Sequence, residues 1–492
     1  MPFVFCLLFA PILLNYETFQ PAWDDTYFLH RAVCIHHAAA NLDLSGINEC
    51  LSILTKSPLM VFSTLPWGAL GGTVSGVGLS FVTLALLSWI LVILIYSLCR
   101  RAGISLQLVI LAGAVVGLNE FVRGMAGSFL VDTPFGLIVA ASCLLVPLEQ
   151  QEGDPMGKSS LARGVLWGVV VSLGILAKIT YLFFAAFLLP LIFILRWRKY
   201  GYRQAFAATA AALFVLLVPL LLFLRLFPNF LSHAVRSSFG AGSEFYASAD
   251  TTLWSHMKNL GHAPGMAVVP LVILLFIVGI RMSREKSWFS WRLVPLFSLL
   301  CYALITLMSS NQDLRFASPV FIGLPFALAA LPKPTAYSET SQHTYWPILF
   351  LVTIVSLPMF ARLDLSQVRL ADAVLQSLPT TTRTSIMLAT DDPHFNIETF
   401  LLAQQLSPLK YSQFSIDTLV YDELRGLSLP KSIDRLAQVD FVVLHTPPLS
   451  MDPPWSNRFA ADFRMYALAH GESQPVPLGA EVEIVKLRHV PH

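Results

Sequence analysis

Residues 164–195 read GVLWGVVVSLGILAKITYLFFAAFLLPLIFIL and contain a single charged side chain, that of Lys178. About 20 apolar residues cross the hydrocarbon core of a bilayer as a helix, and shorter runs can serve inside a bundle, so this stretch predicts two consecutive spans. The whole chain agrees, because 55% of its 492 residues are hydrophobic, 13% are charged and the mean hydropathy is +0.66. A soluble domain carries about a quarter charged residues. The sequence therefore predicts a polytopic α-helical membrane protein.

Hydropathy predicts about eleven transmembrane helices, all of them in the region 1–360. The first lacks a basic n-region and a small-residue cleavage site, so we expect a retained helix rather than a signal peptide. The predicted spans are 1–15, 77–98, 104–119, 134–148, 164–179, 181–195, 205–226, 266–280, 293–309, 316–331 and 346–360.

Basic clusters between the spans predict the orientation, because loops rich in Lys and Arg stay in the cytoplasm. Four clusters fall on one side, while the alternate loops carry most of the acidic residues. We therefore expect a plasma (inner) membrane protein with a cytoplasmic N-terminus and an extracytoplasmic C-terminus. The clusters are Arg100/Arg101, Lys158/Arg163, Arg196/Arg198/Lys199/Arg203 and Arg281/Arg284/Lys286/Arg292.

Two long external loops, 16–76 and 227–265, interrupt the predicted transmembrane domain of residues 1–360. From residue 361 charged side chains return and apolar runs shorten to strand length, so 361–492 predicts a small extracytoplasmic α/β domain. The predicted strands are Ser385–Ala389 and Phe441–Leu444, and the predicted helices lie near 395–406 and 456–469.

Several classes of function find no support in the sequence. The net charge of +2 and the lack of a basic stretch interleaved with aromatics argue against a nucleic-acid partner. No nucleotide-binding glycine loop or zinc-ligand spacing occurs. Six cysteines are too few for a disulfide scaffold, although Cys34 and Cys50 both lie in the first external loop, where an oxidising compartment would allow them to bond.

Three carboxylates lie at the predicted outer membrane face, where charged groups are functional candidates because ions cost about 2.5–3.5 kcal/mol at mid-membrane. Asp24 and Asp25 follow the first span, and one can face a cavity while the other caps the next helix. Asp132 opens the fourth span ahead of Pro134. It can be a simple N-cap, but a helix N-terminus at a cavity also favours bound phosphate.

Basic residues from separate loops are predicted at the same face. Each has a plain alternative: Lys56 and Lys178 can snorkel, Arg123 can pair with Glu120 on a short helix, and Arg315 can anchor at the interface. As a set beside the carboxylates, however, they suit an anionic phosphate headgroup next to a general base.

At these positions the sequence resembles the GT-C membrane glycosyltransferases, the superfamily of aminoarabinose transferase, protein O-mannosyltransferases and lipopolysaccharide-core sugar transferases. Five motifs, in the expected order over residues 1–360, carry the resemblance. They are Asp24-Asp25 followed by Tyr27 and Arg31; Lys56-Ser57-Pro58-Leu59, similar to Lys-Pro-Pro-Leu; Val131-Asp132-Thr133-Pro134-Phe135, similar to a second acidic motif; Gly174-Ile175-Leu176-Ala177-Lys178, similar to Gly-Leu-Ala-x-Leu-Thr-Lys; and Arg315-Phe316-Ala317-Ser318-Pro319, similar to Arg-Tyr-x-x-Pro.

The resemblance implies inverting transfer of a sugar from a polyprenyl-phosphate donor to a glycan, lipid or protein acceptor at the outer membrane face. It implies Asp24 as the general base, with Asp25 as the second choice and Asp132 as a further catalytic carboxylate. Lys56 is expected to bind the lipid phosphate. The full set expected at that phosphate is Lys56, Arg315, Arg123, Lys178 and Arg31.

Two departures from the family pattern leave the metal requirement open. Thr55 stands where the aminoarabinose-transferase branch has a metal-binding glutamate, and Ser57 replaces a proline. A divalent metal stays an option, because His30, His36 and His37 in the first loop could coordinate one, although loop histidines often have no such role.

Three other functions share some of these features. A transporter or flippase usually keeps ionisable groups near the bilayer midplane on broken helices in two repeated halves. Here mid-span charges are sparse and no repeat is evident. A lipid-linked polysaccharide polymerase or ligase would share the topology and a prenyl-linked substrate, and a non-enzymatic scaffold would not need a phosphate-suited charge cluster.

Overall fold

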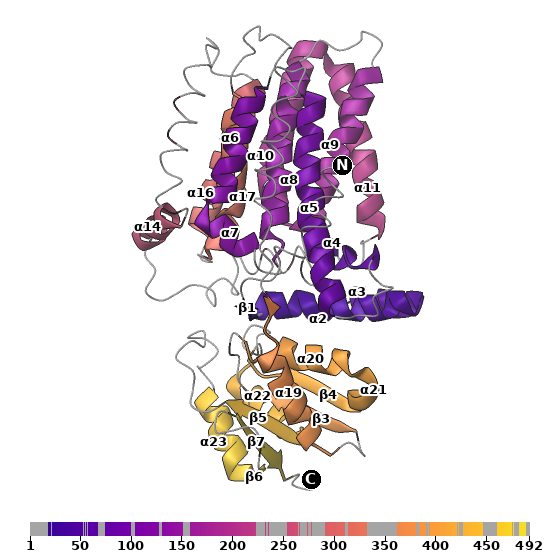
Figure 1. Cartoon of the computed structure of the whole chain (residues 1–492), viewed down its shortest axis with the longest axis vertical. Coiled ribbons are helices and arrows are strands. Elements are labelled where there is room, and N and C mark those ends of the chain that lie inside the picture. The colour runs from indigo at the N-terminus through magenta and orange to yellow at the C-terminus, as the bar shows by residue number, and fades with distance from the viewer. Residues whose placement is uncertain are drawn as a thin grey trace. The chain divides into compact units, whose positions relative to one another are not determined.

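In the computed structural model the chain forms two compact units (Figure 1). The helical unit comprises Met1–Tyr16, Leu51–Ser63 and Leu79–Phe360; the α/β unit comprises Glu17–Cys50, Thr64–Gly78 and Ala361–His492. The structure describes residues 18–20, 22–52, 54, 56, 58–66, 74–99, 104–126, 130–150, 158–222, 232, 235, 253–263, 265, 273, 277, 291–309, 313–331, 362–379, 383–389, 392, 394–420, 422, 427–445, 460–474, 476 and 482–488.

Apolar helices that run side by side dominate the described part of the helical unit (Figure 1). Five are long and apolar enough to cross a membrane and three are shorter; these coincide with eight predicted spans. Predicted spans 1–15 and 346–360, and nearly all of 266–280, lie outside the described residues. The elements are α4 (Pro58–Phe62), α5 (Val74–Cys99), α6 (Leu106–Leu118), α7 (Glu120–Ala126), α8 (Asp132–Leu145), η3 (Val146–Gln150), α9 (Lys158–Ala177), α10 (Tyr181–Tyr200), α11 (Tyr202–Leu222), α14 (Leu253–His262), η4 (Trp291–Leu293), α16 (Val294–Met308), η5 (Leu314–Ala317) and α17 (Ser318–Ala329).

Helix α8 and the 3-10 turn η3 form the most buried of the five long apolar segments. All of α8 is buried, and Asp132–Glu149 is 94% buried. Those 18 residues extend about 27 Å at 1.5 Å per residue, close to the roughly 30 Å of a hydrocarbon core. Helices α17, α9 and α7 pack against α8. These neighbouring helices surround α8, which is apolar on every side, so that its side chains are buried within the protein.

A buried ion pair anchors the far end of this segment. The Glu149 carboxylate accepts hydrogen bonds from Arg196 Nε at 2.5 Å, Arg196 Nη2 at 2.7 Å and Trp167 Nε1 at 2.9 Å. Tyr200 donates to the Glu149 carbonyl at 2.8 Å. Arg196, expected in a cytoplasmic basic cluster, is therefore buried in a polar network that joins η3 to α9 and α10.

Small residues allow α9 and α11 to pack closely. Gly164 and Gly168 lie one turn apart on α9 and face the backbone of α11 at Ala208 and Ala212. A Cβ at Gly168 would lie 2.7 Å from the Ala212 carbonyl oxygen. Such small-xxx-small interfaces let backbones approach in a membrane, where apolar burial alone gives no preference for protein over lipid.

The C-terminal part of the α/β unit is a five-stranded sheet of order β4-β3-β5-β7-β6. Strand β3 pairs in parallel with β4 and β5, and β7 pairs antiparallel with β5 and β6. The predicted strands and helices of the tail are confirmed by β3, β5, α20 and α23. The elements are β2 (Arg362–Leu363), α19 (Ser366–Ser377), β3 (Thr384–Leu388), α20 (Ile397–Leu406), α21 (Pro408–Tyr411), β4 (Phe414–Thr418), α22 (Leu429–Leu436), β5 (Phe441–His445), α23 (Ala460–His470), β6 (Gly471–Gln474) and β7 (Val482–Leu487).

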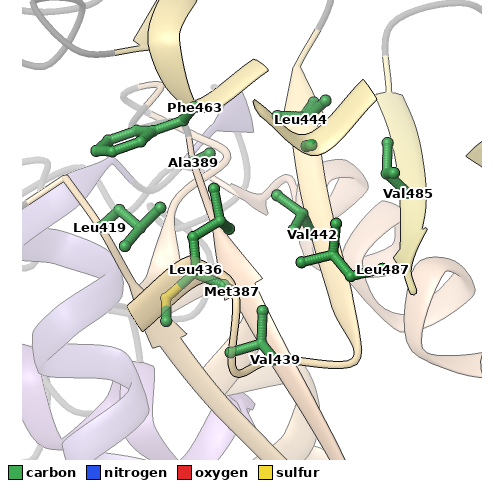
Figure 2. Close-up of a cluster of buried hydrophobic side chains, with 11 residues drawn as sticks. Met387, Ala389, Leu419, Leu436, Val439, Val442, Leu444, Phe463, Val485 and Leu487 are labelled. Carbon is green, nitrogen blue, oxygen red and sulfur yellow. The ribbon is translucent and has the colours of Figure 1, made fainter. Parts of the chain in front are cut away.

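Figure 2 shows the hydrophobic core on one face of this sheet. Met387 of β3, Val442 of β5 and Val485 of β7 meet Leu436 of α22 and Phe463 of α23, all of them buried. Alternate residues of the strands point to this face because side chains in a strand alternate sides. Helices α22 and α23 therefore cover this face of the sheet.

First-loop residues complete the α/β unit with β1 (Thr18–Phe19), α2 (Trp23–Ala40) and α3 (Leu44–Ser52). Strand β1 pairs in parallel with β2, and α2 packs against α20. The pairing that the sequence left open for Cys34 and Cys50 is a disulfide joining α2 to α3. A loop of about 15 residues closed in this way is worth roughly 3 kcal/mol in the chain-entropy model.

We expect Gly168→Ala to destabilise the protein by about 1–3 kcal/mol, because the added methyl must push α11 away. The matched control is Gly261→Ala on α14, where nothing lies within 4 Å of the added carbon. That variant should be neutral or slightly more stable, since Ala is the better helix former. Thermal unfolding in detergent measures both, and equal midpoints for the two variants would contradict the packing described for α9 and α11.

Candidate functional site

The first group of candidate residues lies in the helical unit, where Asp132 and Lys178 form an ion pair. Lys178 Nζ lies 2.6 Å from Asp132 Oδ1, and the side chains are 20% and 4% exposed. Asp132 is the first residue of α8 and Val131 is the N-cap, so the N-cap prediction for Asp132 is wrong. Its carboxylate turns to Lys178, which directly follows α9. The anion at a helix N-terminus and the cation at a helix C-terminus each complement their helix dipole.

Asp313 and Arg315 form a second ion pair in this unit. Arg315 donates from Nε to Asp313 Oδ2 at 2.6 Å and from its backbone N–H to Oδ1 at 2.9 Å. Desolvation raises the pKa of the Asp313 carboxyl, but the charge and hydrogen bonds of Arg315, with the charge of Lys178, outweigh it and leave this pKa below its ordinary value. Asp313 is therefore ionised at neutral pH.

Phe316 joins the two ion pairs. Lys178 Nζ lies 4.7 Å from the centre of the Phe316 ring, and Phe316 directly follows Arg315 in η5. An ammonium group over an aromatic face is attracted by the ring quadrupole, by about 0.5–2 kcal/mol. Two carboxylates and two cations are thus held at neighbouring helix ends, and their charges sum to zero.

Lys56 and Arg123 belong to the same unit. Lys56 is half-buried and lies just before α4, which packs against α9. Arg123 lies in α7, which confirms the short helix predicted there; the Arg123 side chain is outside the described part of the structure.

The second group lies in the first turn of α2. The N-cap of this helix is Ala22, so the expectation that an aspartate would occupy the N-cap is wrong. Asp25 acts instead from the third helical position, where its Oδ2 accepts the Ala22 backbone N–H at 3.4 Å. This is the acidic half of a capping box. Asp25 is 7% exposed, whereas Asp24 is half-buried.

Asp24, Tyr27 and Arg31 share one face of α2, because residues spaced by three, four and seven lie on the same side of a helix. The Arg31 guanidinium carbon lies 5.4 Å from the centre of the Tyr27 ring. Arg31 is 9% exposed, and its Nε has no hydrogen-bond partner among the described residues. This face therefore offers a buried cationic donor on the same side of the helix as a carboxylate.

The first-loop histidines His30, His36 and His37 all lie on α2. Among the described residues, no group of three His, Cys, Asp or Glu side chains could hold a metal ion. His30 Nδ1 lies 3.1 Å from Glu398 Oε2 of α20, and His36 is fully buried. Burial lowers the pKa of His30, although the hydrogen bond and charge of Glu398 oppose the shift, and burial lowers the pKa of His36 as well.

Two of these contacts were missed by sequence reasoning. Glu398 lies 368 positions from His30, and no local pattern joins the two. For Glu149 the sequence held a usable signal, because a lone acid at the end of an apolar span needs a cation beside it.

No protein-family model and no curated protein matches the sequence. Among solved structures, ArnT from Cupriavidus metallidurans bound to undecaprenyl phosphate matches with a TM-score of 0.57, over 98% of this chain and 97% of that chain, at 12% identity. The chain has the GT-C fold. The resemblance expected from the five motifs is thus confirmed at the level of the fold, and the protein is a multi-pass membrane protein.

Two further structures match with lower TM-scores. ArnT from Cupriavidus metallidurans in the apo state gives 0.45 at 10% identity, over 99% of this chain and 97% of that chain. The Archaeoglobus fulgidus oligosaccharyltransferase tethered with an acceptor peptide gives 0.40 at 11% identity, over 100% of this chain and 74% of that chain.

We expect the docking of α2 to weaken as the pH falls below about 6.5, the ordinary pKa of histidine. The unfolded chain takes up protons there, while buried His30 and His36 stay neutral until lower pH, so the free energy of unfolding declines. Hydrogen exchange of α2 between pH 8 and pH 5, corrected for intrinsic rates, measures this. Helix α8 contains no histidine and serves as the control. His30→Gln should flatten the dependence, and α2 protection that is constant from pH 8 to pH 5 would contradict it.

Proposed function

We propose that this protein is a glycosyltransferase that moves a sugar from a polyprenyl-phosphate donor to a cell-envelope glycan, lipid or protein acceptor, with inversion, at the outer membrane face. The observation that carries the proposal is the fold match over nearly the whole length of both chains to ArnT, whose structure holds undecaprenyl phosphate. The ionised groups at neighbouring helix ends support it, because such a donor presents a phosphate at the membrane surface.

The chemistry requires few groups. An inverting transfer needs a carboxylate that takes a proton from the attacking hydroxyl as that oxygen approaches the anomeric carbon. The leaving group is already a phosphate, so it departs without a general acid. The negative charge that grows on this phosphate is stabilised by cations placed beforehand.

Asp24 is the proposed base. Asp25 is buried and accepts the Ala22 N–H, a structural task at the start of α2. Asp24 is more accessible and shares its helix face with Tyr27 and with the buried guanidinium of Arg31.

Phosphate binding is proposed for Lys56, with Arg315, Arg123, Lys178 and Arg31 in support. Lys178 and Arg315 already lie beside Asp132 and Asp313, and these four charges sum to zero. Lys56 lies just before α4 in the same unit, and Lys56 and Arg123 are the further cations proposed at the phosphate. Asp132 orients Lys178 in this scheme.

The outer location of the α/β unit is likewise a proposal. Its support is the Cys34–Cys50 disulfide, because disulfides persist in oxidising compartments such as the bacterial periplasm. The positive-inside pattern of the sequence gives the same orientation.

Thiol labelling of intact cells tests this orientation. Leu409, in α21 of the α/β unit, is 99% exposed, and Lys199, near the end of α10, is exposed as well. An impermeant reagent should label Leu409→Cys in intact cells but Lys199→Cys only after permeabilisation. The parent protein is the control, in which Cys99 and Cys143 are buried and Cys301 is partly buried. Labelling at 199 together with protection at 409 would reverse the topology.

The proposed mechanism is tested by Asp24→Asn, which keeps the shape of the side chain but removes its ability to accept a proton. Initial transfer rate at saturating donor should fall by about 10²–10⁴-fold, while donor binding and membrane insertion are retained. Asp25→Asn should lose less, because Asn can still accept the Ala22 N–H. Near-wild-type rates for both variants would refute the mechanism, and a large loss in Asp25→Asn alone would move the base to Asp25.

A further inference from the structure

The helix that carries the proposed base is built into the C-terminal part of the α/β unit. Strand β1, just ahead of α2, pairs with β2, so that Thr18 lies beside Arg362 and Phe19 beside Leu363. Helix α2 itself packs against α20. Segments of the first loop and of the tail therefore form one structure that includes α2.

A buried polar contact sets how α2 is seated on α20. The side chains of His30 and Glu398 are 7% and 19% exposed, and His30 Nδ1 lies 3.1 Å from Glu398 Oε2. Burial holds the His30 pKa down, so the ring is neutral at pH 7. A carboxylate only accepts hydrogen bonds, so the neutral ring donates from Nδ1. This bond fixes one face of α2 against α20.

The geometry of the helix links this contact to Asp24. His30 follows Asp24 by six residues, which places it about 240° further around the helix axis. The face that binds Glu398 thus differs from the face of Asp24, Tyr27 and Arg31. If α2 turned by 20° about its axis, a carboxylate about 5–6 Å from that axis would move by about 2 Å. Displacements of about 1 Å can cost a reaction 10²-fold.

Cys34 adds a second restraint close to the first. It follows His30 by four residues, so both lie on the same side of α2. The disulfide to Cys50 ties that side to α3. Rotation of α2 is thus opposed by a hydrogen bond to one helix and a covalent bond to another.

We propose that His30 and Glu398 are positioning residues: through them the C-terminal sheet and helices set the rotation of α2, and with it the place of the Asp24 carboxylate. This inference rests on the proposed function, and it deepens that function by making the α/β unit a part of the catalytic machinery. An acceptor bound to this unit would move together with the base.

The test compares His30→Phe, which keeps a ring but no donor, with His30→Asn, which keeps an N–H near the position of Nδ1. In the full-length membrane-embedded protein, His30→Phe should lower kcat by about 10–100-fold while the KM for the polyprenyl-phosphate sugar stays unchanged. His30→Asn should restore most of the rate. Leu409→Ala, at a fully exposed site of the same unit, is the control and should match the wild type.

A double variant that combines His30→Phe with Asp24→Asn distinguishes a positioning role of His30 from general damage to the fold. If His30 acts through Asp24, adding His30→Phe to Asp24→Asn should cause no further loss of rate. Full additivity of the two losses, or a wild-type kcat in His30→Phe, would overturn the inference. Glu398→Leu should reproduce His30→Phe, and the double variant should be no worse than either single one.

Hydrogen exchange of α2 tests the positioning role of His30 separately from the proposed glycosyltransferase activity. Absence of sugar transfer by the wild type would defeat the proposed function alone. Hydrogen exchange still decides the positioning: His30→Phe should speed exchange across residues 23–40 and leave α8 unchanged. Exchange in α2 equal to that of the wild type would overturn the positioning whether or not the enzyme turns over.

Discussion

The helical unit depends on one constraint: a buried apolar segment, Asp132–Glu149, carries an acid at each end. Neither acid can be left alone, because removing one partner of a buried ion pair costs about 3–5 kcal/mol. Asp132 is neutralised by Lys178 and Glu149 by Arg196. Lys178 follows α9 and Arg196 lies in α10, so the two pairs fix the place and axial level of both helices. The ends of this central segment thus decide how its neighbours pack.

The same constraint determines which charged groups lie at the Asp132 end of this segment, the end predicted to face outward. A carboxylate at the start of α8 and an ammonium at the end of α9 satisfy their helix dipoles and each other. Arg315 and Asp313 add a second neutral pair, with the Phe316 ring against Lys178. Such groups are oriented before any ligand arrives, which is what electrostatic stabilisation of a developing charge requires. Groups that the fold needs are therefore already arranged as a polar site.

Sequence reasoning worked where one physical quantity dominated. Hydropathy located the described apolar helices, and the cost of charge near a bilayer singled out Asp132 and Lys178 before their contact was known. It failed at the N-caps of α2 and α8, because the backbone of the preceding residue decides which position becomes the cap. It also missed Glu398, since its partner His30 lies 368 positions away. No periodicity reports a contact between the first loop and the tail.

That contact changes how the role of the tail must be assigned. Taken by itself, the sequence of 361–492 predicts a domain separate from the proposed base and from the cations of the helical unit. In the structure, removing it would also remove β2 and Glu398, the partners of β1 and His30. A truncated chain that loses transfer would thus have lost acceptor recognition, the seating of α2, or both. Only substitutions inside the intact unit separate these causes, because they disturb His30 and Glu398 while the sheet and its core around Val442 remain in place.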